Sequence, residues 1–101
     1  VVLIAYDAPY PEPLHATRPI PDGFAVGLTL ASVEATSRGR TIEVASSDER
    51  ATAMQDAGLE SLRRAIPAAR ALPLFALLAK DRPGHAMIEY LDGRALDVNV
   101  A

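Results

Sequence analysis

The sequence contains no cysteine, few aromatic residues and no long apolar run. Without cysteine, these residues cannot form a disulfide framework, a thiolate metal site or a cysteine nucleophile. The longest apolar stretches are far shorter than the roughly 20 residues that a membrane span needs, and no signal-peptide pattern is present. The formal net charge is −3, whereas nucleic-acid-binding proteins usually carry a basic stripe. We therefore expect a cytoplasmic protein with no nucleic-acid partner and no membrane association.

What the sequence does contain is typical of one folded domain. Its 101 residues are 50% hydrophobic and 23% charged, which is enough apolar material for a modest core. Repeats, low-complexity segments and linkers are absent from the sequence. We expect a single domain spanning residues 1–101, of the α/β class, with a mixed sheet, two short helices and a C-terminal β-hairpin.

Residues 1–6 form a continuous apolar run from Val1 to Tyr6. Such runs are typical of strands that are buried on both faces, and Asp7-Ala8-Pro9 ends this one because proline cannot donate to a ladder. The run starts at residue 1 without a polar lead-in, so we expect the chain to be a fragment of a longer protein. An unpaired strand edge here would pair with another copy, which predicts a homo-oligomer.

Two further strands are predicted in the first half of the chain. Three prolines within residues 9–13 predict a rigid extended loop. Residues 24–33 then alternate large and small side chains, which predicts a strand with one small-residue face. A polar turn at residues 37–40 leads to a shorter strand at residues 41–45, expected to pair antiparallel with the previous one.

The second half predicts helices followed by the hairpin. Ser46 and Glu49 have the spacing of a capping box. Because Gly58 interrupts the pattern, the sequence does not decide whether residues 48–57 form a helix. Apolar side chains at helical spacing run from residue 59 to 69, and Pro67 should end or kink that helix. Pro73 should begin a second helix over residues 74–80. Residues 86–91 and 94–100 flank Asp92-Gly93, which predicts a hairpin on a type I′ turn.

Candidate chemical residues are few and scattered. His15 and His85 are expected in loops, where each could be a general base or a ligand, but surface or packing roles are favoured because nothing of metal-ligand spacing accompanies them. Asp7 ends a strand expected to be parallel, where α/β sheets place ligands, yet a turn-capping role is favoured. Asp22 with Gly23 indicates a turn.

The remaining candidates also have ordinary structural interpretations. Three arginines could form a cationic patch for an acidic partner, but a solvated helix face is favoured: Arg63, Arg64 and Arg70. The tyrosines are too scattered for a binding stripe: Tyr6, Tyr10 and Tyr90. The serines lack the glycine-elbow context of a nucleophile: Ser46, Ser47 and Ser61. We expect no catalytic, cofactor-binding or metal-binding residue in this chain, and no cofactor.

Two stretches resemble a known family. Residues 1–14 (VVLIAYDAPYPEPL) resemble the LVVAYDAPLPEP segment of β-ketoacyl synthase-like proteins, the short relatives of 3-oxoacyl-(acyl carrier protein) synthases often labelled chain length factors. Residues 18–27 (RPIPDGFAVG) are similar to the RP…DGFVLGEGAG segment of ketosynthases proper, and residues 67–74 (PAARALPL) also have the family's character. This chain departs from the family by continuing into Leu28-Thr29-Leu30, without the glycine-rich acidic step.

The resemblance implies both a fold and a function. The chain would be a fragment of a thiolase-like layered fold, the C-terminal half of a ketosynthase-like domain. It would serve polyketide or fatty-acid type biosynthesis as a non-catalytic, chain-length-factor-like partner of a ketosynthase, acting on acyl chains held by an acyl carrier protein. Two alternatives stay open: an active 3-oxoacyl synthase (an acyltransferase) whose nucleophile lies outside this chain, or a small standalone interaction domain. The family's catalytic cysteine and histidines match no position of this sequence.

Overall fold

Two antiparallel sheets organise residues 1–35 and 38–101, which are the residues that this computed structural model describes. The first sheet is a two-stranded ribbon of β1 and β2, and the second has the strand order β3-β5-β4. The predicted α/β class is confirmed, but the strands form two separate antiparallel sheets instead of one mixed sheet. In chain order the elements are β1 Val2–Asp7, α1 Leu14–Thr17, β2 Phe24–Thr29, β3 Ile42–Ser47, α2 Ala57–Ala65, the 3-10 turn η1 Pro67–Ala69, α3 Leu72–Ala79, β4 Gly84–Leu91 and β5 Arg94–Val100.

The predicted C-terminal hairpin is present, and it supplies two strands of the larger sheet. β4 and β5 pair antiparallel around Asp92 and Gly93, with a register shift between Glu89 and Leu91. A type I′ turn needs positive φ at both central residues. Gly93 has φ of 71° while Asp92 has no positive φ, so the predicted turn type was wrong.

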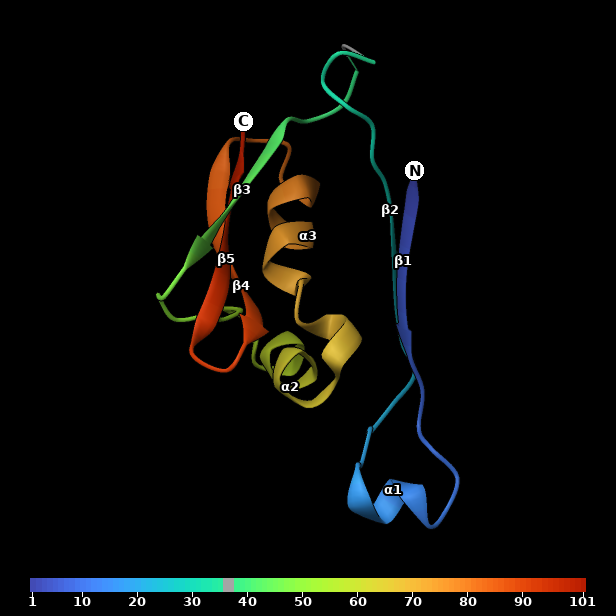
Figure 1. Ribbon diagram of the computed structural model, residues 1–101. Helices are drawn as coiled ribbons and strands as arrows, with labels where there is room; N and C mark the ends of the chain where they lie inside the picture. The colour runs from blue at the N-terminus through green and yellow to red at the C-terminus, as the bar shows by residue number, and fades with distance from the viewer. Residues whose placement is uncertain (36–37) are drawn as a thin grey trace.

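The predicted partner of β3 was also wrong. β3 pairs with β5, from Ile42 opposite Val100 to Ser47 opposite Ala95, and not with β2. Residues 30–35 lead away from the ribbon, and residues 38–41 lead into the second sheet (Figure 1). The expected polar turn at 37–40 lies partly outside the described residues, because residue 37 is not described.

Proline and aspartate set the helix boundaries. Asp56 caps α2 by accepting a hydrogen bond from the Leu59 backbone amide at 2.9 Å. Pro67 ends α2 and starts η1, and Pro73 lies in the first turn of α3, as predicted. The Ser46–Glu49 capping box was wrong because Ser46 and Ser47 lie in β3.

Two small apolar clusters hold these elements together. Ile20, Ile66 and Ala69 are buried where the ribbon meets the end of α2, with Phe24 and Leu62 packed against them. The second cluster joins α3 to one face of the three-stranded sheet, and consists of Ala86, Ile88 and Val98 with Ile42, Ala71, Leu74, Leu77 and Leu96 around them. α3 therefore covers the larger sheet, while η1 connects the helices to the ribbon (Figure 1).

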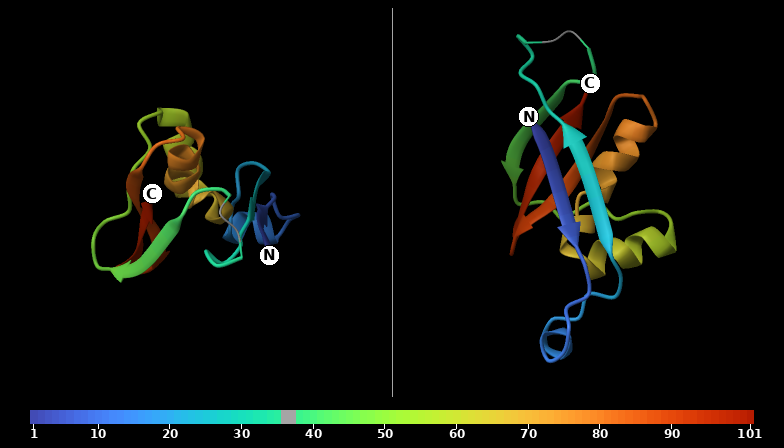
Figure 2. Two further views of the ribbon diagram at one scale, coloured as in Figure 1. Left: turned by 90° about the horizontal axis from the view of Figure 1, so that it is seen from above. Right: turned by 90° about the vertical axis from the view of Figure 1, so that its right-hand side faces the viewer.

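The ribbon stands at one side of the molecule and is largely uncovered. Its first strand was expected to be buried on both faces, but Val2 is 65% exposed and Ile4 is 72% exposed. That expectation was wrong because, among the described residues, β1 pairs on one edge alone and no helix lies over its outer face. The principal extents of 48 × 28 × 24 Å reflect this separated ribbon, which Figure 2 shows from above and from the side.

Candidate functional site

Asp7 makes a tertiary contact, whereas the sequence favoured a role in capping the turn into Pro9. The strand that it ends is antiparallel, which removes the reason to expect a ligand there. Its Oδ2 atom accepts a hydrogen bond from the Ala68 backbone amide at 2.6 Å. The carboxylate therefore ties the end of β1 to η1 and sets where the ribbon stands.

Neither histidine lies in a loop, contrary to the prediction. His15 lies in α1, because the proline-rich loop gives way to a short helix at Leu14. Its Nδ1 atom is buried and has no hydrogen-bond partner within the described part of the chain. His85 lies in β4, a strand of the three-stranded sheet that is distant from α1 in the sequence. The structure does not bring the two histidines together.

His85 forms a pair with an aspartate that the sequence did not suggest. Its Nε2 atom lies 2.7 Å from Asp97 Oδ1, and the Asn99 side-chain amide donates to the same oxygen at 3.1 Å. In the hairpin register His85 faces Asn99, so Asp97 is its diagonal neighbour. The Asp92-Gly93 turn was the signal that could have located this pair, because the turn sets which residues of β4 and β5 face each other. Both side chains are partly exposed on a sheet face, which suits a polar surface contact.

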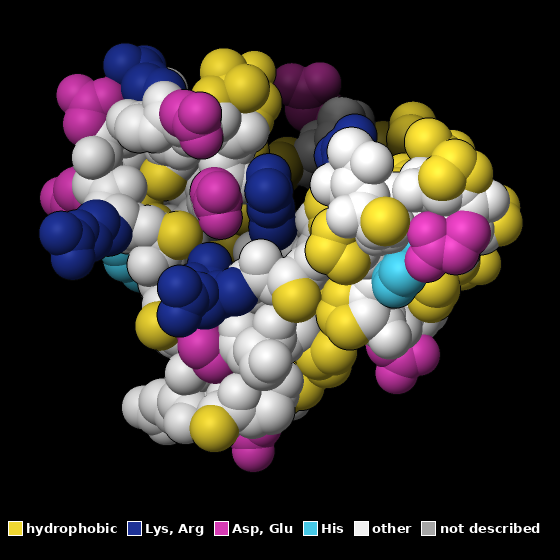
Figure 3. Space-filling model, turned by 90° about the horizontal axis from the view of Figure 1, so that it is seen from below, with side chains coloured by type: hydrophobic (Ala, Val, Ile, Leu, Met, Phe, Trp, Pro, Cys, Tyr) yellow, Lys and Arg dark blue, Asp and Glu magenta, His cyan; other side chains and the backbone are white. Residues whose placement is uncertain are grey.

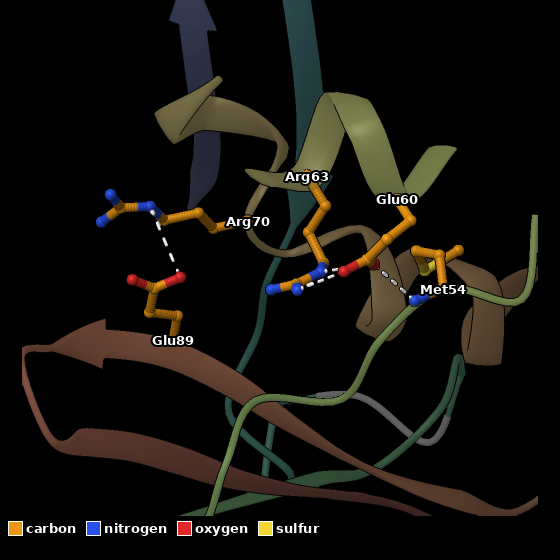
Figure 4. Close-up of polar contacts among 5 residues, drawn as sticks. All are labelled: Met54, Glu60, Arg63, Arg70 and Glu89. Atoms are coloured by element: carbon orange, nitrogen blue, oxygen red, sulfur yellow. Dashed lines mark hydrogen bonds and ion pairs between the residues drawn. The ribbon is translucent and has the colours of Figure 1, made fainter. Parts of the chain in front are cut away.

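The three arginines do not form a cationic patch. Arg63 is buried, at 8% exposure, and makes two hydrogen bonds to the Glu60 carboxylate at 2.8 and 2.6 Å. Arg70 lies 3.9 Å from a carboxylate oxygen of Glu89, and Arg64 is exposed. Figure 4 shows Glu60 between Arg63 and the Met54 backbone nitrogen. The predicted solvated face was wrong for Arg63, and the charge of two of the three cations is compensated locally.

Glu60 is the titratable group whose environment is most clearly altered. Hydrogen bonds from Arg63, and then from the Met54 backbone amide, lower its pKa from 4.5 to about 2. Both donors stabilise the ionised carboxylate, which is the physical cause of the shift. Glu60 thus connects α2 to the segment that leads into it.

The Glu60 contacts predict a specific loss of stability in acid. Between pH 4.5 and about 2 the unfolded chain binds a proton that the folded chain does not. The stabilisation is therefore complete above pH 4.5 and is lost as the pH falls toward 2. Glu60→Gln should lower the melting temperature near neutral pH, and the difference from wild type should vanish in strong acid. Thermal melts followed by circular dichroism across this pH range test it.

Glu49→Gln is the matched control for this measurement. Glu49 is exposed in the segment after β3, so its variant should reproduce the wild-type dependence of melting temperature on pH. A Glu60→Gln profile with the same difference from wild type at every pH would contradict the proposed cause.

The remaining candidates have structural roles or are exposed. Ser46 Oγ lies 2.6 Å from an Arg94 guanidinium nitrogen, which donates to it, and Asp22 Oδ1 accepts from the Gly23 amide at 2.7 Å, as expected of a turn. The tyrosines are spread over different elements and are partly exposed: Tyr6, Tyr10 and Tyr90. Among the described residues, no group of three or more potential ligands is placed to hold a metal ion.

A hollow of about 960 Å³ lies beside the segment that connects β2 to β3, and Leu78 of α3 also lines it. Its apolar wall includes Leu28 within β2 and Leu30 after it, and also Ile42 of β3. Arg40, at its rim, donates to the Ala101 carbonyl oxygen at 2.9 Å and to Asp81 at 3.1 Å. Neither histidine is among the described residues that line the hollow.

The outer face of the ribbon is the most extensive candidate for a functional surface. Figure 3, a view from below, shows many hydrophobic side chains and a few charged ones on the side of the molecule that carries the ribbon, whereas more acidic and basic side chains mix over the other side. Val2, Ile4 and Tyr6 are each about two-thirds exposed, at 65%, 72% and 67%. Sequence reasoning missed this surface because it assigned the same residues to a buried strand. Exposed apolar patches of this kind mark interaction sites.

Comparison with known proteins identifies no relative: no family model, no curated protein and no solved structure matches this chain. In the described ranges, the helices are also too short to cross a bilayer.

Proposed function

We propose that this chain acts as a β-ketoacyl synthase-like component of polyketide or fatty-acid type biosynthesis. Its role would be that of a non-catalytic, chain-length-factor-like partner of a ketosynthase, and its fold a part of a thiolase-like layer. The observation that supports this role is the exposed apolar ribbon. The two stretches that resemble the family become β1 and β2, and they present a surface suited to another polypeptide.

The proposal gives residues 1–101 no part in the condensation itself. Decarboxylative condensation in this family uses a cysteine to hold the acyl chain and histidines to polarise the malonyl thioester. The present residues include no cysteine. His15 lies in α1 beside the ribbon, and His85 is paired with Asp97 on the other sheet. A component of this kind contributes shape and surface to a complex whose reacting groups lie elsewhere.

Reconstitution with a ketosynthase tests the proposal. The protein, a ketosynthase from the same source and malonyl-loaded acyl carrier protein should form a complex whose products differ in length from those of the ketosynthase alone. Mass spectrometry of carrier-bound products gives the lengths, and size-exclusion chromatography gives the complex. An unchanged product distribution together with no complex would refute the proposal.

The same experiment separates the two alternatives. Condensation by the intact protein without any ketosynthase would identify an active synthase whose nucleophile lies outside residues 1–101. Complex formation without a change in products would identify an interaction domain, for which the exposed ribbon is the favouring observation. Ile4→Asp, which places a charge on the outer face, should weaken either kind of complex, whereas Val44→Asp on β3 should not, because Val44 is similarly exposed at 59% but lies on the other sheet.

A further inference from the structure

The outer face of the ribbon has large side chains on one strand and small ones on the other. In the antiparallel register Val2 faces Thr29, Ile4 faces Gly27 and Tyr6 faces Ala25. Directly opposed residues project from the same face of a sheet. β1 therefore forms a ridge of Val2, Ile4 and Tyr6, and β2 forms a trough of Ala25, Gly27 and Thr29 beside it.

The space above the trough is open. All three trough residues are exposed, and a Cβ atom placed on Gly27 would have the Leu3 carbonyl oxygen, 4.0 Å away, as its one near neighbour. The face also carries no charge, because Asp7 belongs to the opposite face with Leu3 and Ala5 and is bonded to Ala68. No charged side chain of the face itself opposes the approach of a second apolar surface.

We propose that a second copy of this chain covers the face, with the ridge of each copy in the trough of the other. A two-fold axis that lies between the two ribbons, parallel to their strands, exchanges the two sides of the ribbon. It places β1 of one copy over β2 of the other while keeping positions along the strands. Ile4 then lies over the other copy's Gly27, Val2 over Thr29 and Tyr6 over Ala25. The interface is isologous, as in most symmetric dimers.

The shape of the face selects this arrangement. A two-fold axis across the strands would instead set ridge against ridge, with both troughs empty. Glycine weakens a strand because it has no side chain to pack, and in strands it often marks a close approach of another chain segment. The position of Gly27 opposite Ile4, the centre of the ridge, is consistent with that use.

The size of the face sets the expected affinity. At about two-thirds exposure, one valine, one isoleucine and one tyrosine contribute roughly 200–300 Å² of apolar surface per copy. With the trough included, two copies bury less than the ~1,200 Å² of the smaller stable interfaces. We therefore expect a weak, concentration-dependent dimer with a dissociation constant of about 10 μM to 1 mM, so that a tighter complex with the ketosynthase proposed above would displace the second copy from the same face.

Filling the trough provides the decisive test. Gly27→Val adds a residue that suits strands, at a site where its Cβ meets no close atom, so the variant should fold. Sedimentation equilibrium from about 10 μM to 1 mM should show dimerisation of the wild type and at least a tenfold weaker dimer for Gly27→Val. If the copies associated through non-specific hydrophobic contact, Gly27→Val would instead dimerise more tightly than the wild type, since the variant exposes more hydrophobic surface.

The matched control adds the same side chain elsewhere. Ala45 is an exposed small residue of β3 in the other sheet, so Ala45→Val should leave the dimerisation constant unchanged. A wild-type chain that stays monomeric over the whole concentration range would overturn the proposal. So would a Gly27→Val dimer that is as tight as the wild type or tighter.

Cross-linking distinguishes this dimer from edge-to-edge pairing of β1. Because the sequence has no cysteine, Ile4→Cys and Gly27→Cys proteins can be mixed and oxidised without disulfides from native cysteines. The ridge-in-trough dimer predicts a mixed disulfide, with Ala45→Cys as the unreactive control. Edge pairing would join two Ile4→Cys copies but leave Gly27→Cys on the far strand, so that outcome would overturn the proposal.

Discussion

Replacing Ile66 with alanine should lower the free energy of unfolding by about 3 kcal/mol, because truncating a buried isoleucine removes apolar contacts and leaves a cavity. Ile66 is 1% exposed and is the largest fully buried side chain. It packs with Ile20 and Ala69 where the ribbon meets the helices. The corresponding drop in melting temperature is roughly 10–25 °C for a domain of this size. Chemical denaturation with urea, followed by circular dichroism, gives the energy directly.

Val44→Ala is the control for this prediction. This substitution also shortens a β-branched side chain, but Val44 is 59% exposed on β3. Surface substitutions usually alter stability by less than about 0.5 kcal/mol. If Ile66→Ala cost no more than Val44→Ala, the small cluster at the base of the ribbon would not be what holds the two sheets together.

Asp7→Ala should lower the free energy of unfolding by about 2 kcal/mol, since it leaves a partly buried backbone amide without its acceptor. The amide is that of Ala68, 2.6 Å from Asp7 Oδ2. The variant should also speed hydrogen exchange at the ribbon amides, because the ribbon loses its polar attachment to η1. Asp7→Asn keeps a side-chain oxygen at this place and should retain most of the stability.

Asp22→Ala is the matched control for Asp7. Asp22 also accepts a hydrogen bond from a backbone amide, but that amide belongs to the neighbouring Gly23 in an exposed turn. Water can replace this acceptor, so the variant should differ little from wild type. Equal effects of the two alanine substitutions would contradict the assigned role of Asp7.

Local patterns predicted the elements well where one residue type decides the backbone. The alternation in residues 24–33 predicted β2 and its two faces, and the burial of the strand alternates accordingly, although it ends at Thr29, four residues earlier than predicted. Pro67 and Pro73 marked the end of α2 and the start of α3. The Asp-Gly dipeptide predicted the hairpin, although the turn type depended on the strand register.

Partners and burial could not be predicted, because they depend on residues far apart in the chain. An apolar run is consistent with burial on both faces, but the run itself does not show what covers it, and β1 proved to be exposed. β3 had two possible antiparallel partners, and nothing in its own residues selected β5 over β2. The Glu60–Arg63 pair was visible as an i,i+3 spacing, yet its burial depended on packing beneath α2. The outer face of the ribbon became apparent only from the register of β1 with β2.

The central position of β5 has a consequence for how the chain folds during synthesis. Both strands of the ribbon are complete once Thr29 has been added, whereas β3 must wait for β5, since Ile42 pairs with Val100. Pairings between distant residues form slowly because the loop entropy is lost before contacts compensate. The residues of the ribbon are therefore made before those of the larger sheet, and the groups that anchor the ribbon, Ile66 and the Ala68 amide, are made after it. A nascent chain would then present this adhesive surface before its larger sheet exists, which is the stage at which chaperones and aggregation compete for it.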